Sequence, residues 1–217
     1  MPRESKAAKK QRALEVCQRM QEHYPAAECA LHYHDPFTLT VAVLLSAQTT
    51  DKSVNSVTPE LFRLYGTPQA MAEARVEDVE RIIHPLGFYH TKAQHCVALG
   101  QKLMAEFGGE VPHSMGELQT LPGVGRKTAN IVMNEGFGEV EGIAVDTHVF
   151  RIAHKLRLSN ADAPLKTEQD LLELIPRELW GPVNHQWILL GREVCIARRP
   201  RCGECFLADI CPSAGRE

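Results

Sequence analysis

The chain has 217 residues, with 24 lysines and arginines against 27 aspartates and glutamates, so its net charge of −3 does not by itself indicate a nucleic-acid-binding protein. An apolar fraction of 44% is ordinary for a globular protein and excludes a disordered or collagen-like chain. No segment approaches the roughly 18 apolar residues of a membrane span, and no apolar core of a signal peptide follows the basic N-terminus, so we expect a soluble cytoplasmic protein.

Short segments bounded by helix caps, proline and glycine dominate the chain, which predicts an all-α fold. Residues 5–23 carry an apolar stripe at helical spacing and are expected to form an amphipathic helix. Asp35 is a typical N-cap and Pro36 a typical first helical residue, and residues 37–47 are apolar on almost every side. We therefore expect a helix buried all round, with a strand over 38–43 as the alternative.

Capping signals predict four more helices. One is expected from Thr67 to near Gly87, and the next over residues 90–107 before a pair of glycines. Capping-box patterns at 114–117 and 167–170 predict two others. No repeat and no long linker separates these segments, so any domain boundary lies within helical sequence.

Seven cysteines divide into two groups. Three are scattered along the chain and are expected to be buried thiols without a disulfide: Cys17, Cys29 and Cys96. The other four fall within seventeen residues, as soft thiolate ligands of zinc or of an iron–sulfur cluster do: Cys195, Cys202, Cys205 and Cys211. Zinc modules usually combine two Cys-x-x-Cys pairs, whereas this segment has one such pair, so we favour a [4Fe-4S] cluster over zinc, and apolar structural cysteines are a third interpretation.

Basic residues gather in two places despite the acidic total. Five lie within residues 1–12, and Arg198, Arg199 and Arg201 lie between the first two clustered cysteines. A loop tied to a metal would hold these arginines rigidly, which favours contact with phosphates. A solvated surface loop is the alternative interpretation.

Residues 121–129 read as a glycine hairpin between two helices. Gly123 and Gly125 allow positive φ, so that successive backbone N–H groups could converge on a phosphate where the second helix begins. A tight turn without a ligand is the alternative. Arg126 and Lys127 directly after the hairpin favour the phosphate interpretation.

Two residues are candidates for chemistry. Lys127 falls in the first turn of its helix, where the helix dipole and the neighbouring Arg126 both favour a neutral amine, the form that attacks carbon and yields a Schiff base. A solvated lysine that binds phosphate is the simpler alternative. Asp146 follows a buried apolar run and is expected to cap the next helix, while its carboxylate could also shuttle a proton or stabilise a cation.

Residues 44–51, 121–129 and 145–148 and the four-cysteine segment together resemble the endonuclease III family, and the resemblance covers nearly the whole chain. It implies a helix-hairpin-helix DNA glycosylase of base excision repair that removes oxidised pyrimidines from double-stranded DNA. The same enzyme would then cut the abasic strand on the 3′ side by β-elimination. A monomeric protein working on bacterial or archaeal DNA is expected.

The resemblance also implies a fold and roles for residues. The fold would be two helical lobes with the active site in the cleft, a six-helix module over 30–138 and a discontinuous iron–sulfur lobe made of 1–29 and 139–217. Lys127 would attack C1′ and Asp146 would activate that step. Residues expected to contact DNA are Gln48 in the gap left by the flipped base, Leu86 and Phe88 as an apolar wedge, and Gly123, Gly125, Arg126 and Arg199.

Two alternatives stay open at the level of sequence. A related glycosylase would act on another lesion, although the mispair enzymes usually lack a lysine at position 127 and the 8-oxoguanine enzyme lacks the cluster. A non-catalytic DNA-binding iron–sulfur protein would need only the hairpin and the cluster. The pairing of Lys127 with Asp146 argues against the non-catalytic protein.

Overall fold

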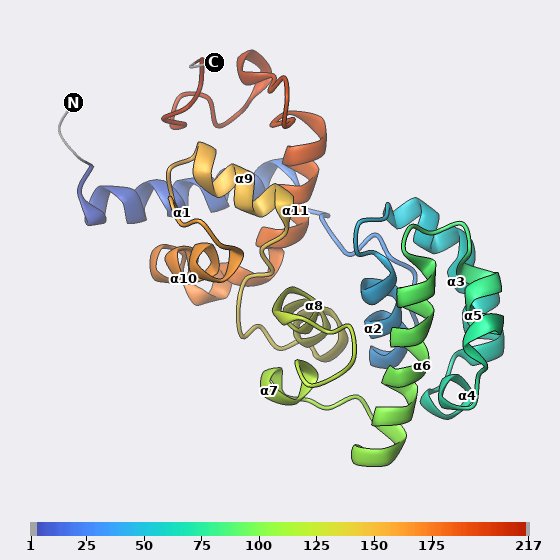
Figure 1. Cartoon of the computed structure of the whole chain (residues 1–217). Coiled ribbons are helices and arrows are strands. Elements are labelled where there is room, and N and C mark those ends of the chain that lie inside the picture. Colours follow the sequence, from blue (N-terminus) through green and yellow to red (C-terminus); the bar gives the residue numbers. More distant parts are fainter. Residues whose placement is uncertain (1–3, 216–217) are drawn as a thin grey trace. The chain divides into compact units, whose positions relative to one another are not determined.

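The computed structural model describes residues 4–215, and over this range the regular elements are helices without a strand, which confirms the predicted all-α fold (Figure 1). The chain divides into two compact units. The hairpin unit is Ala30–Glu141, and the cysteine unit joins the described parts of Met1–Cys29 and Gly142–Glu217. None of the described helices is long and apolar enough to cross a membrane.

The hairpin unit is built around one buried helix, α2. Its helices are α2 (Pro36–Leu45), α3 (Asp51–Tyr65), α4 (Pro68–Ala72), α5 (Val76–Ile83), α6 (Tyr89–Glu106), α7 (Met115–Leu118) and α8 (Arg126–Ile131), which continues as a π-helical turn, Val132–Gly136. Asp35 caps α2 in a reciprocal capping box with Thr38, and every residue of α2 after Pro36 is buried. The helix packs against α3, α6 and α8, so the prediction of a helix buried all round is confirmed and the strand alternative is wrong.

The single helix predicted from Thr67 to near Gly87 is wrong, because the chain forms two helices there. Arg75 has extended backbone angles and separates α4 from α5. Both helices pack against α6, and a Cβ at Gly100 of α6 would lie only 2.7 Å from the backbone nitrogen of Ala72 in α4. The interruption at Arg75 therefore lets α4 and α5 each pack against α6 with a helix axis of its own, which a single straight helix could not do.

The predicted end of α6 is confirmed. The N–H groups of Phe107 and Gly109 both donate to the carbonyl of Leu103, and Gly108 and Gly109 have positive φ. This is the glycine termination that satisfies the last carbonyls of a helix.

The cysteine unit consists of longer helices around a second apolar core. Its elements are α1 (Lys6–His23), α9 (Thr147–Lys155), α10 (Pro164–Leu174), a 3₁₀ turn (Arg177–Leu179), α11 (Trp180–Glu193) and a second 3₁₀ turn (Cys202–Glu204). Trp187 of α11 is fully buried within this core, together with Met20 of α1 and Val149 of α9. Ser5 caps α1, the predicted first helix is confirmed, and α1 packs against α10 and α11 of the C-terminal third of the chain.

The helix predicted to begin with the capping box at 167–170 begins earlier. Ala163 is its N-cap and Pro164 its first residue, because proline suits that position. Thr167 then lies inside α10 with its side chain buried, and its hydroxyl has no hydrogen-bond partner among the described residues. The apolar face of α10 therefore overrides the local capping signal.

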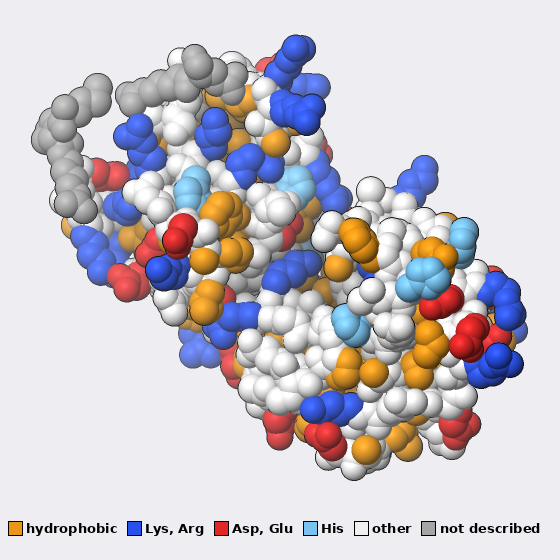
Figure 2. All heavy atoms as spheres, viewed as in Figure 1, with side chains coloured by type: hydrophobic (Ala, Val, Ile, Leu, Met, Phe, Trp, Pro, Cys, Tyr) orange, Lys and Arg blue, Asp and Glu red, His pale blue; other side chains and the backbone are white. Residues whose placement is uncertain are grey.

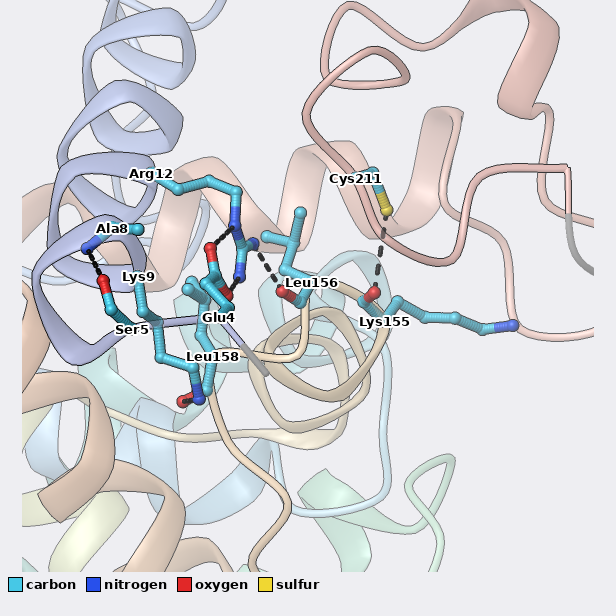
Figure 3. A network of polar contacts seen from close by, with 9 residues as sticks. All are labelled: Glu4, Ser5, Ala8, Lys9, Arg12, Lys155, Leu156, Leu158 and Cys211. Atoms are coloured by element: carbon cyan, nitrogen blue, oxygen red, sulfur yellow. Dashed lines mark hydrogen bonds and ion pairs between the residues drawn. The ribbon is translucent and has the colours of Figure 1, made fainter. Parts of the chain in front are cut away.

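Basic residues of α1 are held by contacts within the cysteine unit (Figure 3). Arg12 donates to both carboxylate oxygens of Glu4 and, at 2.6 Å, to the carbonyl of Leu156 at the end of α9. Lys9 donates to the carbonyl of Leu158 at 3.5 Å. Arg12 and Lys9 therefore attach α1 to the end of α9 and to the residues that follow it, and Arg3 lies outside the described residues.

Candidate active site and metal centre

The hairpin before α8 is a tight turn seated on the core of its unit. The N–H of Val124 donates to the carbonyl of Leu121 at 3.1 Å, and Gly123 has φ +74°, as in a type II turn with proline in the second position and glycine in the third. A Cβ at Gly123 would lie 2.7 Å from Cδ1 of Leu44 and 3.0 Å from Nδ1 of His95. Both the conformation and the space require glycine there.

Gly125 has a different role from the one expected. Its φ is −90°, so the prediction of a positive φ at Gly125 is wrong, and a Cβ there would meet nothing within 4 Å. Gly125 is the exposed N-cap of α8, and no side chain caps this helix. Neither the backbone conformation nor the packing of the fold therefore requires glycine at position 125.

Lys127 is the second residue of α8, in the first helical turn as predicted. It is half-buried, and Thr128 and Ala129 after it are buried and anchor the helix. Lys127 therefore lies next to the positive end of the helix dipole, on a helix anchored by buried residues.

Two other loops of the hairpin unit present residues expected at DNA. Gln48, between α2 and α3, and Phe88, the N-cap of α6, have left-handed φ values of 52° and 59°. Such conformations are costly outside glycine and are often found at functional sites. Phe88 is 65% exposed, whereas Leu86 is 2% exposed and packs in the core, so the prediction of Leu86 as a contact is wrong and Phe88 is the apolar residue exposed on this loop.

Asp146 caps α9, which confirms the predicted structural role. Its Oδ1 accepts from the N–H groups of His148 at 2.9 Å and Val149 at 2.8 Å, and no described residue donates to Oδ2. The buried segment before it is held by Asn184 of α11, whose side-chain amide donates to the carbonyl of Ala144 at 2.7 Å. One carboxylate oxygen therefore fixes the side chain and the other stays available. Lys127 and Asp146 belong to different units.

The four clustered cysteines lie on a series of short turns after α11. The N–H of Cys195 donates to the carbonyl of Leu190 at 2.7 Å, and the N–H of Cys205 donates to the carbonyl of Cys202 at 3.3 Å. Sγ of Cys211 lies 3.6 Å from the carbonyl oxygen of Lys155 at the end of α9 (Figure 3). All four thiols are half-buried and free of disulfides, and all but Cys202 pack against the apolar core.

This donor set fits an iron–sulfur cluster. The four thiols are free and half-buried on one segment, and a four-iron cluster is held by four such cysteine thiolates. Burial raises the pKa of Cys195, opposed by Arg151, and burial also raises the pKa of Cys205, opposed by the N–H of Leu207. Binding of a cluster must therefore displace protons from thiols that the fold partly shields from solvent.

Sequence reasoning missed the residue that positions the first cysteine. Arg151 of α9 donates through Nε and Nη2 to the carbonyl of Cys195 and through Nη2 to that of Gly191, at 2.8 to 3.3 Å. A side chain 44 residues from its partner leaves no local pattern. The expected contact Arg199 is exposed on the loop after Cys195.

One of the three scattered cysteines, Cys29, is less buried than expected. Cys17 and Cys96 are buried, but Cys29 is half-buried, at the end of the first segment of the cysteine unit.

On the face shown in Figure 2, lysine and arginine side chains are frequent over the cysteine unit, while the hairpin unit presents more uncharged surface with scattered histidines.

Comparison with known proteins places this chain in a family of DNA repair enzymes. The HhH-GPD superfamily of base excision DNA repair proteins matches residues 41–177, and the iron–sulfur binding domain of endonuclease III matches residues 195–211, from the first clustered cysteine to the last. Endonuclease III of Synechocystis sp. is 48% identical over 96% of this chain and 95% of its own length. The chain belongs to the endonuclease III family.

Other relatives extend the match to structure. Endonuclease III of Escherichia coli K12 is 43% identical over 93% of this chain and 95% of its own. The solved structure of a trapped endonuclease III–DNA covalent intermediate has a TM-score of 0.90 at 41% identity, covering 94% of this chain and 96% of that one. A thermostable thymine-DNA glycosylase shares the fold, with a TM-score of 0.85 at 20% identity.

Membership of the endonuclease III family makes this protein a DNA-binding base excision repair glycosylase with abasic-site lyase activity. It also makes Cys195, Cys202, Cys205 and Cys211 the ligands expected for a [4Fe-4S] cluster, because the matched iron–sulfur segment begins and ends at its outer cysteines.

Proposed function

We propose that this protein removes oxidised pyrimidines from double-stranded DNA and cuts the resulting abasic strand through a Schiff base on Lys127. The observation that carries the proposal is the position of Lys127, half-buried in the first turn of α8 directly after a hairpin that requires glycine at position 123. The positive end of the helix dipole and the adjacent Arg126 both favour the neutral, nucleophilic amine.

The chemistry begins at C1′ of the damaged nucleoside. The amine of Lys127 forms a bond to C1′ while the C1′–N bond to the base breaks, and the electron pair leaves with the base, which takes up a proton. The amine then loses one proton, and its lone pair forms the C1′=N bond of the Schiff base iminium as the C1′–O4′ bond of the sugar ring breaks and O4′ takes up a proton. Removal of a C2′ proton expels the 3′ phosphate by β-elimination, and water finally releases the lysine.

Asp146 is proposed as the proton carrier of this sequence. Both capping hydrogen bonds end on Oδ1, so the carboxylate is held in one orientation while Oδ2 can accept a proton from the attacking amine. A carboxylate also stabilises the cationic iminium by its charge. Asn184 supports this role indirectly, because it holds the segment that leads to Asp146.

Gln48 and Phe88 are proposed to occupy the duplex when the damaged nucleotide is turned out. Both are exposed and both are held in left-handed backbone conformations at the ends of short loops. An inserted side chain replaces part of the stacking lost on extrusion, and an aromatic ring provides more stacking surface than a leucine. The backbone of Gly123 and Gly125 with Arg126 would hold the phosphates on the hairpin unit, and Arg199 would hold a phosphate on the cysteine unit.

The four clustered cysteines would hold the [4Fe-4S] cluster, which supplies a rigid, redox-capable cross-link between the turns after α11. Arg151 fixes the carbonyl of Cys195, and Cys211 contacts the end of α9, so the cysteine loop and α9 with its Asp146 cap form one connected structure. We propose that the enzyme acts as a monomer, because the proposed residues come from one chain.

A panel of duplexes, each with one defined lesion, tests this proposal. We expect release of oxidised pyrimidines followed by two strand fragments, one with an unsaturated aldehyde at its 3′ end and the other with a phosphate at its 5′ end. Activity only on an alkylated base would contradict the lesion class. Binding without base release from any duplex would favour the non-catalytic alternative.

A further inference from the structure

The loop that carries Gln48 is closed by a hydrogen bond across Gln48 itself. The hydroxyl of Thr49 donates to the carbonyl of Ala47 at 3.3 Å, so the residues on either side of Gln48 are joined. The N–H of Thr49 also donates to the carbonyl of Ser46, the C-cap of α2. Hydrogen bonds from Thr49 thus hold the backbone on both sides of Gln48, which has a left-handed conformation.

Lys92 of α6 controls the direction of that hydroxyl. Its ammonium nitrogen lies 2.6 Å from Oγ1 of Thr49, and the side chain is only 4% exposed. An ammonium can only donate, so Oγ1 must accept from Lys92 and must direct its own single proton elsewhere. The carbonyl of Ala47 is the acceptor that the structure provides.

Lys92 also lies one turn from the second exposed loop. Its main-chain N–H donates to the carbonyl of Phe88 at 3.0 Å, as any residue would at that place in α6. The side chain, by contrast, is specific to lysine and reaches a loop 43 residues earlier in the chain. Lys92 therefore connects the loops of Gln48 and Phe88.

We propose that Lys92 is a positioning residue that, through Thr49, holds Gln48 in the conformation needed to fill the gap in the duplex. The inference rests on the proposed function, because Gln48 has this task only in an enzyme that turns a nucleotide out of DNA. Lys92 does not touch the substrate in this account. It reduces the conformational freedom that Gln48 would otherwise lose on binding.

Stability of the fold alone does not account for this lysine. Burial lowers the pKa of Lys92, an effect opposed by the nearby Cys96 thiol, so the site disfavours the charge that it holds. A methionine would fill the same space without that desolvation cost. We therefore expect Lys92→Met to fold at least as stably as the wild type.

The test measures binding to a duplex that contains an uncleavable abasic-site analogue. Lys92→Met should weaken binding about tenfold, the usual scale for loss of one charge-assisted hydrogen bond. Thr49→Val, which breaks the same contact from the less buried side, should weaken binding similarly, and Thr49→Ser should restore it. Lys102→Met is the matched control, because Lys102 lies on the same helix and forms an ion pair with Glu106 of that helix at 3.4 Å.

A double-mutant cycle distinguishes positioning from a general structural effect. In a Gln48→Ala background, Lys92→Met should cause no further loss, because the side chain that it positions is gone. Equal affinity of Lys92→Met and wild type, or the full tenfold loss repeated in the Gln48→Ala background, would overturn the inference. Failure of the wild type to prefer the abasic duplex over an undamaged one would overturn the proposed function, and the inference with it.

Discussion

The two units of this protein present their polar groups in opposite ways. In the cysteine unit, Arg12 and Arg151 are bound to carbonyl groups of the same unit and hold its segments together. In the hairpin unit, Gln48 and Phe88 are exposed from strained loops, and Gly123 seats the hairpin directly on α2 and α6. The number of basic residues therefore does not locate the proposed DNA-binding surface, because side chains such as Arg12 and Arg151 stabilise the fold.

The largest expected effect on stability comes from removing one cluster ligand. Cys202 is the one of the four proposed ligands that does not pack against the apolar core, so Cys202→Ser removes a thiol with little change in packing. We expect loss of iron and a fall in unfolding free energy of more than about 3 kcal/mol, because cluster binding is coupled to folding. Iron analysis and urea unfolding measure both.

Cys29→Ser is the control for that experiment, since Cys29 is half-buried but lies outside the four-cysteine segment. It should keep its iron and most of its stability. Full iron content in Cys202→Ser would remove Cys202 from the ligand set and weaken the contrast between the two units.

The next effect separates the two glycines of the hairpin. Gly123→Ala should destabilise the protein by roughly 2 kcal/mol, because the new Cβ meets Leu44 and His95 at a positive φ. Gly125→Ala should leave stability within about 0.5 kcal/mol and reduce DNA affinity, because its Cβ points into open space at the start of α8. Equal destabilisation by both variants in chemical unfolding would contradict the assignment.

A smaller effect tests the divided role of Asp146. Asp146→Ala should lose the cap and about 1 kcal/mol of stability, together with most strand cleavage. Asp146→Asn keeps a capping oxygen, so its stability should match the wild type while strand cleavage still falls. Retention of full cleavage by Asp146→Asn would show that the charge is not used.

The smallest effect concerns acid and the N-terminal helix. Hydrogen bonds from Arg12 lower the pKa of Glu4 below its usual 4.5, so this contact stabilises the folded state above that pH and is lost as the pH falls through the lowered pKa. The contribution is less than about 1 kcal/mol because solvent screens the pair. The stability difference between wild type and Glu4→Gln should therefore shrink in acid, and a difference that grows would refute it.

Sequence alone was sufficient where the signal is local. Asp35 and Pro36 marked the start of α2. The four cysteines and Lys127 lie in short motifs, in which the residue types and their spacing indicate the chemistry. The break at Arg75 carries no glycine or proline, so only packing against α6 creates it. Lys92 could not be found either, because its contact with Thr49 depends on how α6 passes the end of α2.

The most direct test of the central claim is covalent trapping by borohydride on abasic-site DNA. The wild type should give a stable protein–DNA adduct, Lys127→Gln should give none, and Arg126→Gln should still give one, because it keeps the nucleophile while losing the neighbouring charge. An undiminished adduct with Lys127→Gln, or no adduct with the wild type, would contradict the assignment of Lys127 as the Schiff-base lysine.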